Sequence, residues 1–252
     1  MFRYAVLLTL AASSLTVGFA QTNATPPDFS GVYYPITGPG APPPPRAAGS
    51  NGPPVRRNPN TDGSLGRTAS EPALRPEYLA KWEMMSKTRI AGSSEYDNVA
   101  KCLPPGMPWM MSMAYGMEVM QIKDKITFFS ELNDALRRVY LDGRKPTQKI
   151  LDDPTYAGYS TGHWEGDTLV VDTVALHPES YIVGFTPHSD QMTVHERIRL
   201  TSPNVLEDQI HVDDPKALLM PWETSRAYRK AAPGKNDELR EFACPEGLAD
   251  AK

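Results

Sequence analysis

Four segments of the chain place ionisable residues directly beside large apolar ones, and these segments are the first candidates for chemistry. The segments are Arg137-Arg138-Val139-Tyr140, Gly162-His163-Trp164-Glu165, Val170-Val171-Asp172 and His195-Glu196-Arg197. We expect all four to be β-strands, whose successive side chains point to opposite faces. If the apolar residues two positions away mark the interior, Arg138, Asp172 and Glu196 are predicted to point inward.

Charges on an interior face have two interpretations. A buried carboxylate beside a buried guanidinium is costly unless the two pair, so the residues could form a structural ion-pair network. Alternatively, they could line a polar pocket whose groups have shifted pKa values suited to general acid–base chemistry. The pattern alone leaves both interpretations open.

Two further features could serve a small-molecule site. The loop 184–190 precedes a predicted hairpin and contains His188, whose imidazole could carry a proton near neutral pH or merely cap a turn. A run rich in methionine could form a soft wall for a flat aromatic ligand or simply fill the core. This run contains Met107, Trp109, Met110, Met111, Met113, Tyr115, Met117 and Met120.

Several familiar classes of site are absent from the sequence. There is no Gly-rich phosphate loop, no Gly-x-Ser-x-Gly turn and no Cys-x-x-Cys pair. The five histidines lack metal-binding spacing, so we expect no metal and no cofactor, although a metal site assembled from separate strands stays open. A net charge of −4 gives no electrostatic reason to expect nucleic acid or an anionic membrane as a partner. A small aromatic molecule is the expected partner, and the oligomeric state is left open.

The N-terminus predicts export. A basic start, an apolar stretch too short to span a bilayer, and Gly18-Phe19-Ala20 before Gln21 predict a signal peptide over residues 1–20, cleaved after Ala20. We therefore expect a periplasmic protein. In that oxidising compartment the two cysteines, Cys102 and Cys244, are expected to form a disulfide, with two free thiols as the alternative.

The elements that must position these residues follow from periodicity and turn signals. Residues 21–34 hold a short strand, and the Pro-rich segment 35–75 is expected to run over the surface or stay disordered. Helical spacing follows over residues 75–90. The domain over residues 76–252 is expected to contain this helix followed by strands. Three hairpins are predicted, formed by 116–122 with 126–132, 159–164 with 168–174, and 191–200 with 205–212. Three further strands are predicted at 137–141, 225–229 and 239–244. Successive short-turned hairpins favour a mainly β fold, an antiparallel meander forming a barrel or a strongly bent sheet.

These motifs together resemble a large family of secreted, lipocalin-like bacterial proteins of mostly unknown function. The resemblance covers nearly the whole mature chain. It is carried by Asp28-Phe29-Ser30-Gly31-Val32, residues 138–144, Gly162-His163-Trp164-Glu165-Gly166-Asp167-Thr168-Leu169-Val170-Val171-Asp172-Thr173, His195-Glu196-Arg197, Asp214-Pro215-Lys216, Pro221-Trp222 and Glu241-Phe242-Ala243-Cys244.

The resemblance implies an activity, because some proteins similar to this family are cofactor-independent lyases or decarboxylases of lignin-derived aromatic dimers. Residue type and strand parity then suggest roles: Arg138 holds a carboxylate, Tyr140 and His188 carry protons, and Asp172 or Glu196 is the base. Trp109, Tyr115, His163 and Trp164 are the expected substrate-binding residues. The alternative is a non-catalytic binding protein that holds an apolar or aromatic molecule in the same barrel.

Overall fold

The computed structural model describes residues 25–37, 71–235 and 237–243. The predicted signal peptide, most of the Pro-rich segment and Cys244 lie outside the described residues.

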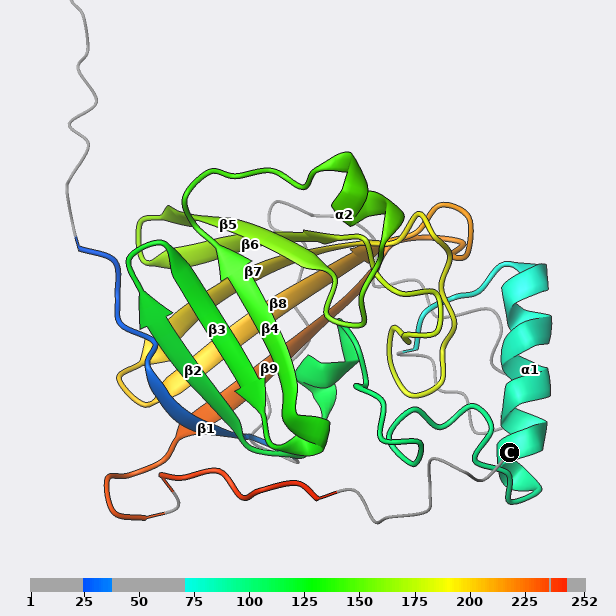
Figure 1. The fold of residues 1–252 in the computed structure, drawn as a ribbon, viewed down its shortest axis with the longest axis horizontal. Helices are drawn as coiled ribbons and strands as arrows, with labels where there is room; N and C mark the ends of the chain where they lie inside the picture. Colours follow the sequence, from blue (N-terminus) through cyan, green and yellow to red (C-terminus); the bar gives the residue numbers. More distant parts are fainter. Residues whose placement is uncertain (1–24, 38–70, 236, 244–252) are drawn as a thin grey trace, which may run out of the picture.

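The described residues form a closed barrel of nine strands joined in chain order (Figure 1). The strands are β1 (Gly31–Pro35), β2 (Met117–Ile122), β3 (Lys125–Ser130), β4 (Ala135–Tyr140), β5 (Tyr159–Glu165), β6 (Thr168–Val174), β7 (Thr193–Ser202), β8 (Val205–Asp213) and β9 (Trp222–Lys230). Two α-helices, α1 (Pro76–Ile90) and α2 (Gln148–Asp152), and two 3-10 turns, η1 (Trp109–Ser112) and η2 (Leu132–Asp134), complete the elements. The mainly β, lipocalin-like barrel expected from the sequence is confirmed.

Each predicted hairpin forms because a tight polar turn lies between two runs of alternating apolar residues. β5 and β6 pair from Tyr159↔Val174 to Glu165↔Thr168, and Gly166 between them has a φ of 64°, a left-handed value that favours glycine. The β2–β3 and β7–β8 hairpins also form where predicted. Short connections thus account for most of the barrel.

Two strand predictions were wrong. β4 and β5 are parallel and pair only at Val139↔Ser160 and Tyr140↔Thr161, because the long connection containing α2 returns the chain to the end at which β4 began. Residues 239–243 form no strand. β1 pairs with both β2 and β9, so the barrel is closed.

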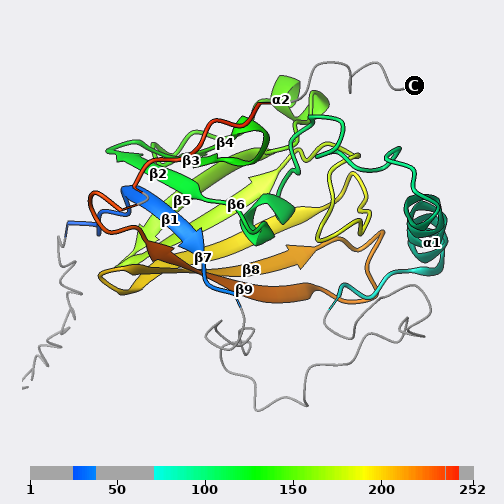
Figure 2. The ribbon, with the colours of Figure 1, turned by 90° about the horizontal axis from the view of Figure 1, so that it is seen from below.

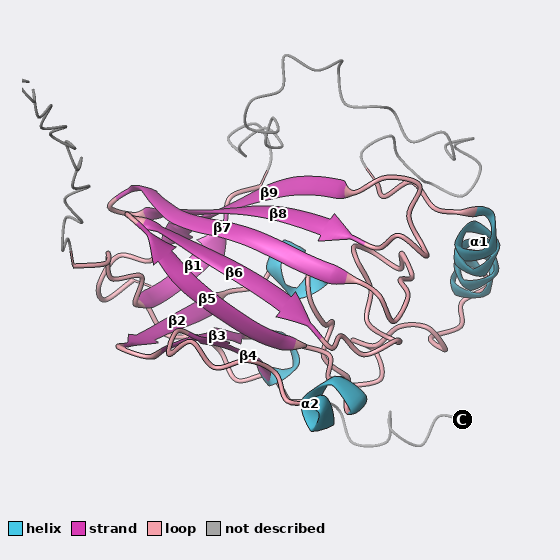
Figure 3. Cartoon of the chain, turned by 90° about the horizontal axis from the view of Figure 1, so that it is seen from above, coloured by secondary structure: helices cyan, strands magenta, loops and turns pink. Residues whose placement is uncertain are grey.

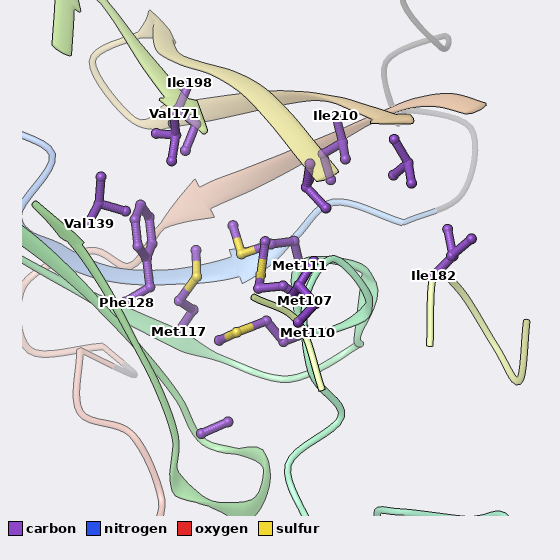
Figure 4. Packing of buried hydrophobic residues seen from close by; sticks show 14 of the residues in the cluster. Met107, Met110, Met111, Met117, Phe128, Val139, Val171, Ile182, Ile198 and Ile210 are labelled. Atoms are coloured by element: carbon purple, nitrogen blue, oxygen red, sulfur yellow. The ribbon is translucent and has the colours of Figure 1, made fainter. Parts of the chain in front are cut away.

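The barrel interior is filled with side chains. Met110 and Met111 of η1, and Met107 just before it, pack with Met117 and the interior strand residues, as Figure 4 shows. Met107 and Met111 are almost fully buried. The methionine run therefore mainly fills the core, and its side chains occupy the interior of the barrel.

Loops and α1 cover one end of the barrel (Figures 2 and 3). α1 begins at Pro76. Proline is favourable in the first turn of a helix, because the backbone N–H that it lacks would have no partner there. The helix buries Trp82, Met85 and Ser86. The last residues of the Pro-rich segment also belong to the body, since residues 72–74 are buried and Leu74 bridges Leu218. That end of the segment therefore does not run over the surface as expected. No helix among the described residues is long and apolar enough to cross a membrane.

Met111→Ala should test the filled interior. Met111 is 1% exposed, so its truncation should lower the free energy of unfolding by about 2–5 kcal/mol in urea titrations. Met120→Ala is the matched control, because Met120 on β2 is 41% exposed and its loss should change stability by less than about 0.5 kcal/mol. Equal effects of the two substitutions would contradict the packing of η1 inside the barrel.

Candidate functional site

The charge inside the barrel is carried by Arg137, not by Arg138. Arg137 is 1% exposed, whereas Arg138 is exposed on the outer face of β4. The inward parity of β4 is set by Ala135, Arg137 and Val139, so the prediction that Arg138 points inward was wrong. Asp172 is likewise exposed on β6, whose buried residues Val171 and Thr173 flank it. Only Glu196, which is 1% exposed, has the predicted inward orientation.

Arg137 uses its whole guanidinium in a buried network that joins four strands. Its Nη1 lies 2.8 Å from Glu196 Oε1, and its Nη2 also pairs with Glu196 Oε2. Nε donates to Ser160 Oγ at 3.2 Å and Nη2 to Thr173 Oγ1 at 3.1 Å. The two hydroxyls lie 2.8 Å apart and bond to each other. This geometry matches the structural ion-pair interpretation, since each of the three guanidinium nitrogens has a protein partner.

A second buried carboxyl group, Asp208, adjoins this pair. Asp208 on β8 lies directly opposite Ile198 on β7 and is fully buried. Among the described residues, no donor forms a hydrogen bond to either of its carboxyl oxygens. Burial raises the pKa of Asp208 well above its usual range, and the negative charge of Glu196 raises it further. The raised pKa favours the neutral form of Asp208 beside the ion pair of Arg137 and Glu196.

A surface groove opens beside β4, where β4 and β5 part. Only the end of β4 pairs with β5, so the first half of the strand has a backbone partner on the β3 side alone. The groove has a volume of about 400 Å³. Its lining residues are Pro104, Gly106, Met110, Ala135, Leu136, Arg138, Tyr140, Thr155, Tyr156, Ala157, Gly158 and Tyr159.

The groove has aromatic walls and one cation among its lining residues, and a second cation, Arg144, stands over the Tyr140 ring at 4.3 Å from its centroid. Arg138 and Tyr140 project from β4, Tyr156 comes from the connection that leads into β5, and Tyr159 is the first residue of β5. The rings of Tyr140 and Tyr159 lie 5.3 Å apart between centroids. Tyrosine faces suit a planar aromatic ligand, and an arginine suits a carboxylate.

Tyr156 is the groove residue best placed to move a proton. Its hydroxyl lies 3.4 Å from Glu179 Oε2, to which it donates, and its ring stacks on His177 at 4.6 Å between centroids. Burial raises the pKa of Tyr156, and the nearby charge of Glu179 raises it further. Sequence reasoning missed Tyr156 and Glu179 because the two lie in irregular segments without a strand pattern.

His188 lies in a different pocket. That pocket, of about 320 Å³, is lined by Glu77, Tyr78, Lys81, Pro178, His188, Ser189 and Asp190, so it lies between α1 and the loop before β7. His188 is almost fully buried, and burial lowers the pKa of its imidazole. His188 is therefore neutral at pH 7.

Hydrogen bonds fix the tautomer and position of His188. Its Nδ1 lies 2.7 Å from the Ser189 carbonyl, which can only accept, so Nδ1 donates and Nε2 accepts from Ser180 Oγ at 2.8 Å. Ser189 is held in turn by Asp214, which accepts from its backbone N–H at 2.7 Å and its hydroxyl at 2.6 Å. These bonds match the turn-capping alternative for His188 more closely than a proton carrier at the groove.

None of the four expected substrate-binding residues is among the residues that line either pocket. Trp109 is buried against Tyr181 and Phe185, with ring centroids 5.7 Å and 5.4 Å away. Trp164 packs on the N-terminal segment through Phe29. Tyr115 is 42% exposed, and His163 lies on the outer face of β5 beside Glu165. The structure thus brings Arg138 and Tyr140 together in the groove and separates them from His188, Glu196 and Asp172.

No protein-family model and no curated protein matches the sequence. The expected disulfide stays a prediction, because Cys244 lies outside the described residues.

Substitution of the two neighbouring arginines of β4 should change the stability of the protein to very different extents. Arg137→Met leaves Glu196 buried without its counter-charge and should lower the free energy of unfolding by about 3–5 kcal/mol. Arg138→Met, on the exposed face, should change it by less than about 0.5 kcal/mol. Urea titration of both variants measures the difference, and a larger loss for Arg138→Met would refute the parity described above.

Asp208→Asn should make the barrel relatively more stable as the pH rises. Above the ordinary aspartate pKa of 3.8, Asp208 loses its proton in the unfolded chain but keeps it in the folded chain. The free energy of unfolding of the parent therefore falls as the pH rises, until the pH passes the raised pKa of folded Asp208. Asparagine stays neutral throughout, so the difference between variant and parent should grow by up to about 1.4 kcal/mol per pH unit.

Urea titrations between pH 5 and pH 8, roughly the range in which folded proteins are commonly most stable, would measure this trend. Asp124→Asn is the control, because Asp124 lies in the exposed β2–β3 turn and its substitution should give no such trend. A difference for Asp208→Asn that is constant with pH would show that folded Asp208 ionises normally.

Proposed function

We propose that the protein binds a small aromatic carboxylate in the groove beside β4 and acts on it as a cofactor-independent lyase, most simply a decarboxylase. The observation that carries the proposal is the coincidence of three tyrosine rings and one exposed arginine around a single groove. Its volume of about 400 Å³ lies within the range of sites for small molecules. A phenolic compound derived from lignin, as the family resemblance implies, has the matching shape and charge.

Binding would follow from the positions of the lining side chains. The guanidinium of Arg138 would pair with the carboxylate of the ligand, and Tyr140 and Tyr159 would contact its ring. Met110 and Leu136 offer an apolar surface to the remainder of the molecule. None of the residues that line the groove is an aspartate or a glutamate, so no fixed negative charge within it opposes an anion.

The chemistry would need only proton transfers. For a para-hydroxyphenyl acrylate, removal of the phenolic proton and protonation of the carbon that bears the carboxylate give a quinone methide. The bond to the carboxylate then breaks, its electrons restore the aromatic ring and the side-chain double bond, and carbon dioxide leaves. Tyr156 with Glu179 would take the phenolic proton, and Tyr140 would supply the proton to carbon. The phenolate product would then recover its proton from Tyr156 and Glu179, and water would reprotonate Tyr140.

A non-catalytic binding function is the second candidate. It is favoured by the distance of the expected acid–base residues from the groove, since Glu196 is sealed in the barrel, Asp172 faces outward elsewhere and His188 lines another pocket. A binding protein would use the same arginine and tyrosines without turnover. In both cases we propose that the protein acts in the periplasm after removal of residues 1–20, with Cys102 and Cys244 joined.

The groove proposal predicts that Arg138→Met weakens the binding of phenolic carboxylates about tenfold to a hundredfold, because a charge-assisted hydrogen bond of about 1.5–3 kcal/mol is lost. Calorimetry or tryptophan fluorescence with a panel of such acids would measure the dissociation constants. The corresponding carboxamides should bind the parent and the variant equally.

Arg199→Met is the matched control, since Arg199 is an exposed arginine on β7 and is not among the groove residues.

Mass analysis of the same incubations separates the two candidate functions. Release of carbon dioxide or formaldehyde without added cofactor would establish the lyase, and tight binding without product would establish the binding protein. An Arg138→Met variant that binds like the parent would exclude the groove as the site.

A further inference from the structure

A row of four ionisable side chains crosses the outer wall of the barrel. Asp172 on β6 pairs in register with His195 on β7, His195 with His211 on β8, and His211 with Glu223 on β9. Because directly opposed residues project to the same face, all four side chains lie side by side. All four are at least one-third exposed.

Each histidine of the row is held by a carboxylate through the same ring atom. His195 Nδ1 lies 2.5 Å from Asp172 Oδ1, and His211 Nδ1 lies 3.1 Å from Glu223 Oε1. A carboxylate accepts, so Nδ1 carries the proton in both neutral rings and the lone pair is on Nε2. A carboxylate behind an imidazole is the arrangement that orients histidine ligands of metal ions and raises their basicity.

The spacing of the two rings fits a shared ion. A zinc ion bound at about 2.0–2.1 Å from Nε2 lies about 3.2 Å from the centroid of the imidazole ring. When two imidazoles bind one ion, and the angle between them at the ion lies between tetrahedral and linear, their centroids are about 5–6.5 Å apart. The centroids of His195 and His211 are 6.0 Å apart. The one other polar contact at either Nε2 that the structure gives is Thr193 Oγ1, 3.4 Å from that of His195.

We propose that the outer wall of the barrel binds a divalent transition-metal ion of the zinc, copper or nickel class through Nε2 of His195 and His211, with Asp172 and Glu223 orienting the two rings. No three or more His, Cys, Asp or Glu side chains form a ready metal cluster in the described ranges, so water completes the coordination shell. Imidazole ligands select this class of ion over magnesium or calcium. The bound ion cross-links β7 and β8, and so stabilises the folded barrel.

The site is distinct from the groove beside β4, because none of the four residues lines that groove. The inference therefore does not depend on the proposed lyase or binding function. Sequence spacing could not reveal it, since the two histidines are adjacent only through the register of β7 and β8.

Titration of the mature chain, freed of chelator and of any affinity tag, with Zn²⁺ in a calorimeter tests the proposal. We expect binding of one ion per chain and a rise in Tm when Zn²⁺ is present. His195→Gln and His211→Gln should each abolish binding at this site. Asp172→Asn and Glu223→Gln should weaken it about tenfold to a hundredfold, because the ligands remain but lose their orienting partners.

His163→Gln is the matched control, because His163 is an exposed histidine beside Glu165 on the neighbouring strand β5 and should leave Zn²⁺ binding unchanged. The Tm of each variant without metal shows whether it is folded. Absence of stoichiometric binding to the parent, or binding that survives in the His195→Gln/His211→Gln double variant, would overturn the proposal. A loss equal in His163→Gln and His211→Gln would also overturn it, since binding would then be non-specific.

Discussion

A guanidinium cannot stay inside a barrel without a counter-charge and partners for its N–H groups, and Arg137 meets this requirement by bonding to three other strands. From β4 it bonds to Ser160 on β5, Thr173 on β6 and Glu196 on β7. These are the strands on the far side of the one parallel junction, where the backbone ladder joins only two residue pairs. The buried network thus connects the wall where backbone pairing is shortest.

The same junction creates the groove. If β4 and β5 paired along their whole length, the residues of β4 from Ala135 to Arg138 would face a neighbouring strand. Instead the connection containing α2 spreads away from the barrel, and Tyr156 and Tyr159 stand opposite Arg138 and Tyr140. The polar network and the aromatic groove therefore lie at the same junction, with Arg137 inside the barrel and Arg138 outside.

The filled interior separates this barrel from a simple carrier that holds its ligand at the centre. Methionines in and just before η1 occupy that space together with strand residues, and the raised pKa of Asp208 favours its neutral form beside the Arg137–Glu196 pair. Small-molecule chemistry is consequently expected at the wall, where β4 and β5 part. The outer face of β6 to β9 carries a second set of polar groups, the carboxylate–imidazole row, whose spacing suits a metal ion instead of an organic molecule.

The sequence by itself determined the hairpins from which the barrel is built, because hairpin signals are local, and it left open whether they close into a barrel or form a strongly bent sheet. The turn at Gly166 and the alternation on either side of it specify β5 and β6 without reference to the remainder of the chain. The inward position of Glu196 followed from alternation with Val194 and Ile198 on a long, regular strand. The alternation of Arg137 and Arg138 was ambiguous, since Val139 and Tyr140 are both large and either parity places one of them inside.

Only the tertiary structure decided the relations between distant segments. The parallel junction, the entry of η1 into the interior and the meeting of Arg138 with Tyr156 all depend on where long connections lead, and no short-range pattern encodes that. The pairing of His195 with His211 depends likewise on strand register. A register shift of one residue would place the two imidazoles on opposite faces, so register is the physical reason that the candidate metal site exists.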